Sequence, residues 1–369
     1  MSGQGTLRNL AGALALDWPR YQWAFHSKGA GWVRLCNRHE RLEHRTDERG
    51  VRCVWPWTST LYAPRVLPSL GLGLLRRAER EHPFHFAREP KALGAPPQLT
   101  FIIGHRGRTR LPHLLVTLGS IAAQQGAHCE TIVVEQSVAP EIREDLPPWV
   151  RYVHTPLPHP AMPYCRAWAF NVGARLARGS VLCLHDNDLP APADYALEHL
   201  GYLARGYQVV NLKRFIFYLD PNATDALFGQ WVSGASASGG LWGEGGKPMT
   251  PPEKILQNAL GGGSLVIDRA AYFAIGGFDE AFVGWGGEDN ELWELVQTLR
   301  LYPYGYLPML HLWHPAQPDK GHDRGRGGLT ASLFDARMAL PVAQRIEELC
   351  ARSMGDPRSP NPPWSPPAP

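Results

Sequence analysis

The sequence has 369 residues, enough for one large domain or two ordinary ones, and 44% of them are hydrophobic, as in ordinary globular proteins. The formal net charge of +3 calls for neither a nucleic-acid partner nor an anionic membrane. No apolar stretch reaches membrane-spanning length, and the N-terminus lacks a signal-peptide core. We therefore expect a protein without a transmembrane segment, soluble or at most peripherally associated with a membrane.

Residues 1–97 contain many Trp, Arg and His residues but no long periodic segment, so we predict a small accessory region of unknown role there. From residue 98 to residue 350, strand-like and helix-like segments alternate, beginning with a buried strand at 99–105 and a helix at 111–125. This alternation predicts an α/β fold with a mostly parallel central sheet and helices on both faces. Residues 351–369 are rich in proline, and we predict a disordered tail.

The six cysteines form no C-x-x-C pair, which argues against a zinc ribbon or a thioredoxin-type site. Cys129 and Cys183 lie in or beside apolar runs, where reduced cysteines are usually buried. Cysteine usage therefore predicts free thiols and a cytoplasmic location.

Two carboxylates, Asp186 and Asp188, follow the buried strand that begins at residue 180. Residues two apart on a strand point the same way, so both could face one divalent cation, which favours oxygen ligands. A solvated turn that caps the next helix is the open alternative. Further along, His311 and His314 lie near the end of the last predicted strand, and we favour His314 as a metal ligand over a surface residue.

The stretch "GWGGEDNE" (284–291) is the most specific one. Glu288 and Asp289 stand at a predicted helix start, where the helix dipole favours the anionic form, and such a carboxylate can act as general base toward a hydroxyl. The alternative is that Glu288 and Asp289 are ordinary acidic residues in the first turn of a helix, without a catalytic role. The surrounding glycines and Trp285 argue against this alternative.

Other candidate polar residues lie at the ends of the first two strands or on a later predicted helix. Arg106 and Arg108 suit a diphosphate, although a solvated loop is the alternative, and Glu135 ends the second strand at the same sheet edge. Arg166 and Asn171 lie on one helix but not on one stripe, and a structural role for Asn171 stays open.

The order "HRGR", "YCRAWAFNVGAR", "LHDNDLP", "GGGSLVIDRAAYFAIGGFDEAFVGWGGEDNELWELV" and "MLHLWHP" resembles the β-1,4-galactosyltransferase family and the bacterial family-2 glycosyltransferases that share its C-terminal motif. The resemblance covers about residues 99–315. It implies a GT-A (nucleotide-diphospho-sugar transferase) fold, a nucleotide-sugar donor, usually a UDP-sugar, a Mn²⁺ (or Mg²⁺) ion, and inversion at the anomeric carbon. The expected acceptor is a glycan or glycoconjugate, and the expected product a bacterial surface polysaccharide or glycoconjugate.

By that likeness Asp289 deprotonates the acceptor hydroxyl, and Asp188 and His314 bind the metal. His311 falls where the family has a softer ligand, and Asp186 would contact the ribose or sugar beside the metal. Trp285 would be a lid residue over the donor and acceptor. The remaining matched positions fall into two groups, acceptor-binding (Glu288, Gly262 and Gly263) and nucleotide-sugar-binding (Arg106, Arg108, Glu135, Arg166 and Asn171).

Two departures affect specificity. Leu260 stands where the galactosyl enzymes have an aromatic residue, which would leave room for an N-acetyl group, and His311 changes the metal's ligand set. We further expect two glycine- and proline-rich segments, 231–252 and 315–328, to be mobile loops that close over the donor. The competing classes are a nucleotidyltransferase, which would want a better phosphate-binding glycine loop, and a non-catalytic glycan-binding or scaffold protein. The sequence leaves the oligomeric state open.

Overall fold

A computed structural model of the chain describes residues 3–365, except 28, 30, 47, 56–57, 92–95, 234–249 and 316–329. The cores of both segments expected to be mobile loops lie outside the described residues. The first part of the chain contains α1 (Gly3–Gly12), a π-helical turn η1 (Ala13–Asp17), α2 (Trp18–His26), α3 (Tyr62–Val66), α4 (Pro68–Glu81) and the small hairpin β1 (Leu42–His44) and β2 (Val51–Cys53).

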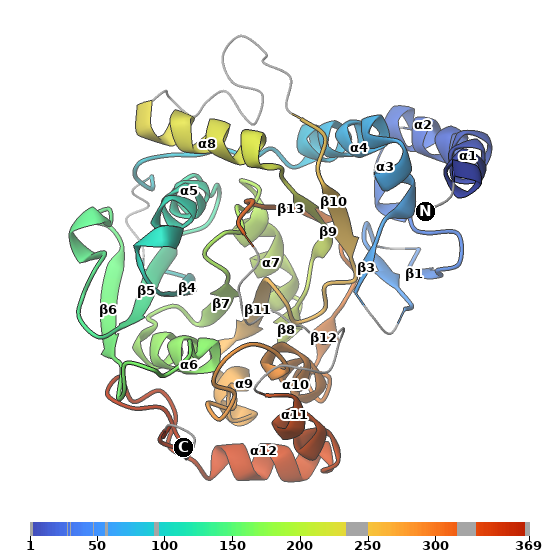
Figure 1. Cartoon of the computed structure of the whole chain (residues 1–369). Coiled ribbons are helices and arrows are strands. Elements are labelled where there is room, and N and C mark those ends of the chain that lie inside the picture. Colours follow the sequence, from blue (N-terminus) through green and yellow to red (C-terminus); the bar gives the residue numbers. More distant parts are fainter. Residues whose placement is uncertain are drawn as a thin grey trace.

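The described strands form a central seven-stranded sheet (Figure 1). Its order is β12 (Leu301–Tyr302), β8 (Val209–Val210), β11 (Ser264–Asp268), β7 (Val181–His185), β4 (Leu99–His105), β5 (Cys129–Ser137) and β6 (Arg151–Pro156). Within it, β11 runs antiparallel to both β7 and β8, whereas the other described pairs are parallel. The mostly parallel α/β sheet predicted from the sequence is confirmed.

Helices cover both faces of this sheet because successive strand residues point to opposite sides. Phe101 and Ile103 of β4 belong to one hydrophobic cluster, together with side chains of α5 (Leu111–Ala122) and α7 (Tyr195–Ala204). Ile102 belongs to a second cluster on the other face, with α6 (Arg166–Leu176), α9 (Arg269–Ala274), α10 (Glu288–Val296) and α12 (Val342–Cys350).

A second sheet has the order β13 (Leu307–His311), β9 (Lys213–Tyr218), β10 (Lys254–Gln257) and β3 (Ser59–Thr60) among the described strands. After β9 the chain continues into α8 (Pro221–Ser233), which packs on α5, and α11 (Ala331–Met338) precedes α12 at the other end of the molecule (Figure 1). None of the described helices is both long and apolar enough to cross a membrane.

The first 97 residues share the core of the rest of the chain. Trp32, Leu74 and Phe84 are fully buried in the same cluster as the strands β9 and β13. The buried guanidinium of Arg214 on β9 donates to the carbonyl of Val33 at 2.6 Å. The described part of residues 1–97 therefore packs against the sheets rather than forming a separate globule.

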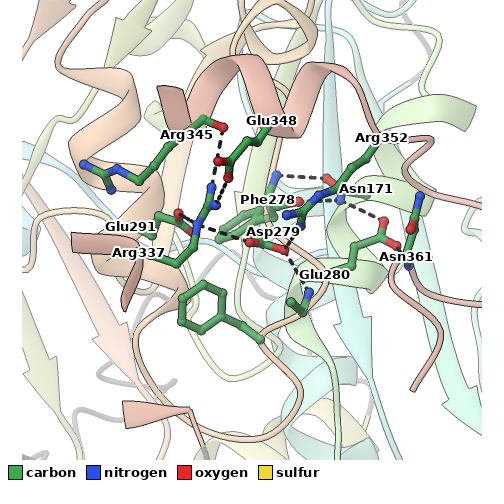
Figure 2. Close-up of polar contacts among 12 residues, drawn as sticks. Asn171, Phe278, Asp279, Glu280, Glu291, Arg337, Arg345, Glu348, Arg352 and Asn361 are labelled. Atoms are coloured by element: carbon green, nitrogen blue, oxygen red, sulfur yellow. Dashed lines mark hydrogen bonds and ion pairs between the residues drawn. The ribbon is translucent and has the colours of Figure 1, made fainter. Parts of the chain in front are cut away.

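The C-terminal residues 351–365 pack against the protein, whereas the sequence predicted disorder there. Trp168 Nε1 donates to the carbonyl of Asp356 at 2.7 Å, and the backbone N–H groups of Gly355 and Asn361 both donate to Glu280 at 2.7 Å. Figure 2 shows part of this buried polar network. Proline disfavours regular secondary structure here, but the N–H groups of Gly355 and Asn361 find a partner in the buried carboxylate of Glu280.

Candidate functional site

The acidic turn after β7 lies beside the glycine run that precedes β11. Because Ser264 pairs with His185 in the antiparallel register, the backbone N–H of Asp186 donates to the Gly263 carbonyl at 2.8 Å. Buried His185 fixes the turn, since its ring nitrogens contact Ser264 Oγ at 2.8 Å and the Leu189 carbonyl at 2.7 Å. The strand pairing thus places the D-x-D carboxylates and the glycine run at one sheet edge.

Asp188, His311 and His314 form a candidate metal centre. Their ligand atoms all lie within 4.8 Å of one another, with Asp188 Oδ1 3.8 Å from His311 Nε2 and Asp188 Oδ2 3.4 Å from His314 Nε2. The parallel pairing of β13 with β9 delivers His311, which stacks on Tyr218 with ring centroids 4.0 Å apart. Burial lowers the pKa of His311 to about 4, so its imidazole is neutral and can act as a ligand near pH 7.

A carboxylate with two imidazoles is a donor set that suits Mn²⁺ and other divalent first-row metals. The structure thus brings together Asp188, His311 and His314, the predicted ligands. Asp186 does not join them among the described residues, because its carboxylate turns toward Arg166. Its predicted metal contact is therefore not seen, although it lies two residues from Asp188.

Arg166 links the acidic turn to the E-D pair. Its Nη2 lies 2.7 Å from Asp186 Oδ1, its Nη1 donates to Asp289 Oδ1, and the same Nη1 lies 3.8 Å from Glu288 Oε1. These residues meet because α6 and α10 both begin at this edge of the sheet. Burial, then the nearby Asp289 charge, raises the pKa of Glu288 to about 7, and burial likewise raises the pKa of Asp186. One cation therefore faces three clustered carboxylates.

The glycine run packs directly against Asp289. A Cβ at Gly261 would lie 2.7 Å from the Asp289 carbonyl oxygen, and one at Gly262 would lie 3.5 Å from Asp289 Oδ2. Gly263 has a φ of +79°, a conformation that residues with a Cβ rarely adopt. The predicted acceptor-site glycines Gly262 and Gly263 thus lie beside the candidate base.

Sequence reasoning missed two residues of this site. Arg110 Nη1 lies 2.8 Å from Asp188 Oδ2, and buried Lys213 donates from Nζ to the carbonyls of Ser264 and, at 3.3 Å, Leu260. The sequence offered an indication of each: a third arginine in "HRGRTR", and a lysine that, with Arg214, directly precedes the apolar run 215–219.

Four predicted donor-binding residues lie apart from the carboxylate cluster, held by other protein groups. Arg106 donates to the carbonyls of Gln136 and Met162 at 3.0 and 2.9 Å, and exposed Arg108 pairs with Asp145 at 2.9 Å. Glu135 is fully buried and accepts hydrogen bonds from Tyr152 and Ser137.

The remaining one, Asn171, is a correction. It is fully buried, and its amide donates to Phe278 and Glu280 while accepting from Tyr272 and Phe278 (Figure 2). The amide uses its donor and acceptor positions within the protein, so it holds residues 278–280 and offers nothing to a donor.

Trp285 lies in the glycine turn just before α10 and is 44% exposed, an unusual degree for a tryptophan. Thr330 Oγ1 donates to its carbonyl at 2.9 Å, which ties this turn to the start of α11. This turn leads directly into α10, where Asp289 lies four residues further along the chain.

Comparison with known proteins supports part of this description. A family model described as the N-terminal domain of galactosyltransferase matches residues 253–302, which run from β10 through the glycine run to the end of β12. The resemblance to galactosyltransferases is confirmed over that stretch, which includes Glu288 and Asp289. No curated protein sequence matches the chain at a significant level.

Two solved structures show a loose likeness. The catalytic domain of Drosophila β1,4-galactosyltransferase 7, in complex with xylobiose, is 15% identical with a TM-score of 0.30, over 56% of this chain and 64% of that chain. This chain therefore spans less than two thirds of that galactosyltransferase. The mannosyltransferase PcManGT from Pyrobaculum calidifontis, in complex with GDP-Man and Mn²⁺, is 17% identical with a TM-score of 0.36, over 80% and 77%. At such TM-scores the likeness does not by itself establish a shared fold or substrate.

Proposed function

We propose that the chain is an inverting, divalent-metal-dependent glycosyltransferase of the GT-A fold. It would move a sugar from a nucleotide-sugar, a UDP-hexose or UDP-N-acetylhexosamine, to a hydroxyl of a glycan or glycoconjugate. The main support for this proposal is that the candidate metal centre lies beside the candidate base. Asp186, two residues before Asp188, contacts Arg166, and Arg166 also contacts Asp289. The family match over residues 253–302 supports it independently, because that stretch holds the candidate base.

The residues present fit a divalent metal ion, held by Asp188, His311 and His314. A Mn²⁺ or Mg²⁺ ion bound there would offset the negative charge that develops on the leaving diphosphate. Arg110, 2.8 Å from Asp188, would add a second positive charge on the same side. Positive charge at the D-x-D turn would stabilise an anionic leaving group.

Asp289 acts on the acceptor side. Its carboxylate contacts the Arg166 guanidinium and can accept the proton of an acceptor hydroxyl as that oxygen attacks the anomeric carbon. Glu288, with a pKa of about 7, is partly protonated near neutral pH and can donate a hydrogen bond to the acceptor. A single displacement from the face opposite the diphosphate inverts the anomeric centre.

The proposal also covers the cellular compartment and the role of the N-terminal region. The six cysteines, all within the described residues, are free thiols, which supports a reducing, cytoplasmic compartment. The N-terminal region contributes β3 beside β10, the strand that leads into the glycine run, which supports an accessory role near the acceptor side.

The test is the release of free nucleotide by purified protein from a panel of UDP- and GDP-sugars, with Mn²⁺ and with EDTA. We expect release from one donor that requires the metal and is lost in Asp188→Asn. Conversion without metal, or equal activity in Asp188→Asn, would refute the metal-dependent mechanism. Absence of both release and nucleotide binding by calorimetry would favour a non-catalytic glycan-binding protein instead.

A further inference from the structure

The first helices form an arm along the edge of the molecule. This N-terminal arm, residues 3–26, runs from α1 through η1 into α2, and both Gly12 and Trp18 at the junctions keep right-handed helical backbone angles. Figure 1 shows α1 and α2 at the outer edge, beyond α3 and α4. One side of the arm faces the protein, because Ala13, Tyr21 and Ala24 are buried.

The other side of the arm is apolar and exposed. Leu7, Leu10, Leu14 and Trp18 recur at intervals of three or four residues, the spacing of one helix face, and Leu7 is 70% exposed. Trp23, on the same arm, is 61% exposed. Monomeric soluble proteins seldom expose a contiguous apolar row of this kind, which marks interaction surfaces.

Several arginines lie in the arm or contact it. Arg8 and Arg20 lie in the arm, Arg38 lies 3.5 Å from Asp17, and Arg80 donates to the Phe25 carbonyl at 3.4 Å. Asp17, the only acidic residue of the arm, is buried and contacts both Arg20 and Arg38.

The charge is also concentrated on this part of the chain. Residues 1–91 hold fifteen Lys and Arg residues and eight Asp and Glu residues, a net charge of +7, against +3 for the whole chain. Such asymmetry within one chain is typical of proteins that contact an anionic surface.

We propose that the N-terminal arm docks on a membrane surface that carries anionic lipids. The leucines and tryptophans enter the interface between headgroups and acyl chains, and the arginines contact the headgroup phosphates. A second copy of the chain is the less favourable occupant, because pairing two arms would bring their arginines together. The arm lies outside the proposed catalytic site, so the inference does not depend on the proposed chemistry.

The experiment is co-sedimentation of the full chain with vesicles of phosphatidylcholine alone and of phosphatidylcholine with phosphatidylglycerol. We expect at least tenfold tighter binding to the anionic vesicles at low salt, weakening as the salt concentration rises. The variant Leu7→Gln/Leu14→Gln/Trp18→Gln should lose binding to both kinds of vesicle. Leu197→Gln, an exposed leucine on α7, is the matched control and should bind like the wild type.

Circular dichroism shows whether the triple variant is folded, and nucleotide release from a soluble sugar donor is measured in the same preparations. Lost vesicle binding with folding and nucleotide release retained supports the arm as a membrane contact. Wild-type protein that ignores anionic vesicles, or a folded triple variant that still binds them, overturns the proposal. A wild-type dimer in solution that the triple variant abolishes would also overturn it, by assigning the face to a second copy.

Discussion

The guanidinium of Arg166 contacts carboxylates from two separate elements, Asp186 after β7 and Asp289 at the start of α10. A charged group shared in this way couples the two sides of the site, since either carboxylate loses its partner if the arginine moves. Donor-side and acceptor-side changes should therefore show non-additive effects in double-mutant cycles that include Arg166.

Asp289→Asn would remove the proposed proton acceptor while keeping the shape of the side chain. We expect transfer to fall by roughly 10²–10⁴-fold, because general-base assistance is lost, while the donor dissociation constant stays near that of the wild type. Kinetics with the donor identified above and calorimetry of nucleotide binding measure the two quantities. Asp335→Asn on the exposed side of α11 is the control, and wild-type transfer by Asp289→Asn would show that the base is another residue.

His314→Ala should weaken the proposed metal site while leaving the sheet intact, because His314 lies three residues beyond the last residue of β13. Loss of one imidazole ligand should raise the Mn²⁺ concentration for half-maximal activity at least tenfold, the order expected when the ligand shell is damaged. Titration of Mn²⁺ into chelator-treated protein checks this. Asp335→Asn, the exposed control on α11, should leave the titration unchanged.

The candidate metal ligands were easier to predict from the sequence than the residues that contact them. Asp188, His311 and His314 were predictable because strand ends meet at one sheet edge, so residues far apart in sequence converge. The contact of Arg110 with Asp188 was not predictable, since neighbouring arginines in one loop look alike until the backbone orients them. Asn171 was assigned to the donor because burial on the far side of a helix leaves no mark in a single sequence.

At the scale of elements, Lys213 connects β9 to the loop that carries the glycine run. Its ammonium has three N–H donors and three acceptors, the carbonyls of Ser264 and Leu260 and, at 2.8 Å, Asn211 Oδ1. Lys213→Met keeps the length of the side chain but leaves those acceptors without this donor. We expect a several-fold rise in KM for the acceptor with a smaller change in donor binding. Lys91→Met, an exposed lysine ahead of β4, is the control and should leave both quantities unchanged.

The same lysine predicts a pH dependence of stability. Burial lowers the pKa of Lys213 from 10.5 to about 7, so between these values the unfolded chain binds more protons than the folded protein. The free energy of unfolding should then rise with pH above 7, by at most about 1.4 kcal/mol per pH unit from this group. Denaturant titrations of wild type and Lys213→Met at pH 7 and pH 8.5 isolate it, and parallel pH profiles would contradict the low pKa.

For the whole molecule, the C-terminal residues act as a strap across the second hydrophobic cluster. Deleting residues 351–369 would remove two N–H donors from buried Glu280 and the acceptor of Trp168 Nε1, each orphaned group costing about 1–3 kcal/mol. We expect the Tm to fall by roughly 5 °C or more. Deleting residues 366–369 alone, which takes none of these contacts, is the control, and equal melting of both would show that the strap adds no stability.

The sheet was predictable from its sequence because β4, β5 and β7 are apolar runs separated by helical periodicity. Two features of the fold could not be predicted in this way. The antiparallel direction of β11 depends on how the chain returns after residue 258, which local pattern does not encode. The packing of residues 1–97 depends on long-range contacts such as Arg214 with Val33, and a buried arginine looks like a surface one in sequence.

The pairing of β3 with β10 bears on how the chain can be divided. Only Ser59 and Thr60 form this outer strand, with Gln257 and Leu256 as their partners, and residue 257 stands four positions before the glycine run. A fragment starting at residue 98 would therefore expose β10 as a bare edge, a template for intermolecular strand addition. Such a fragment should aggregate, and even its soluble fraction should hold the loop next to Asp289 less firmly.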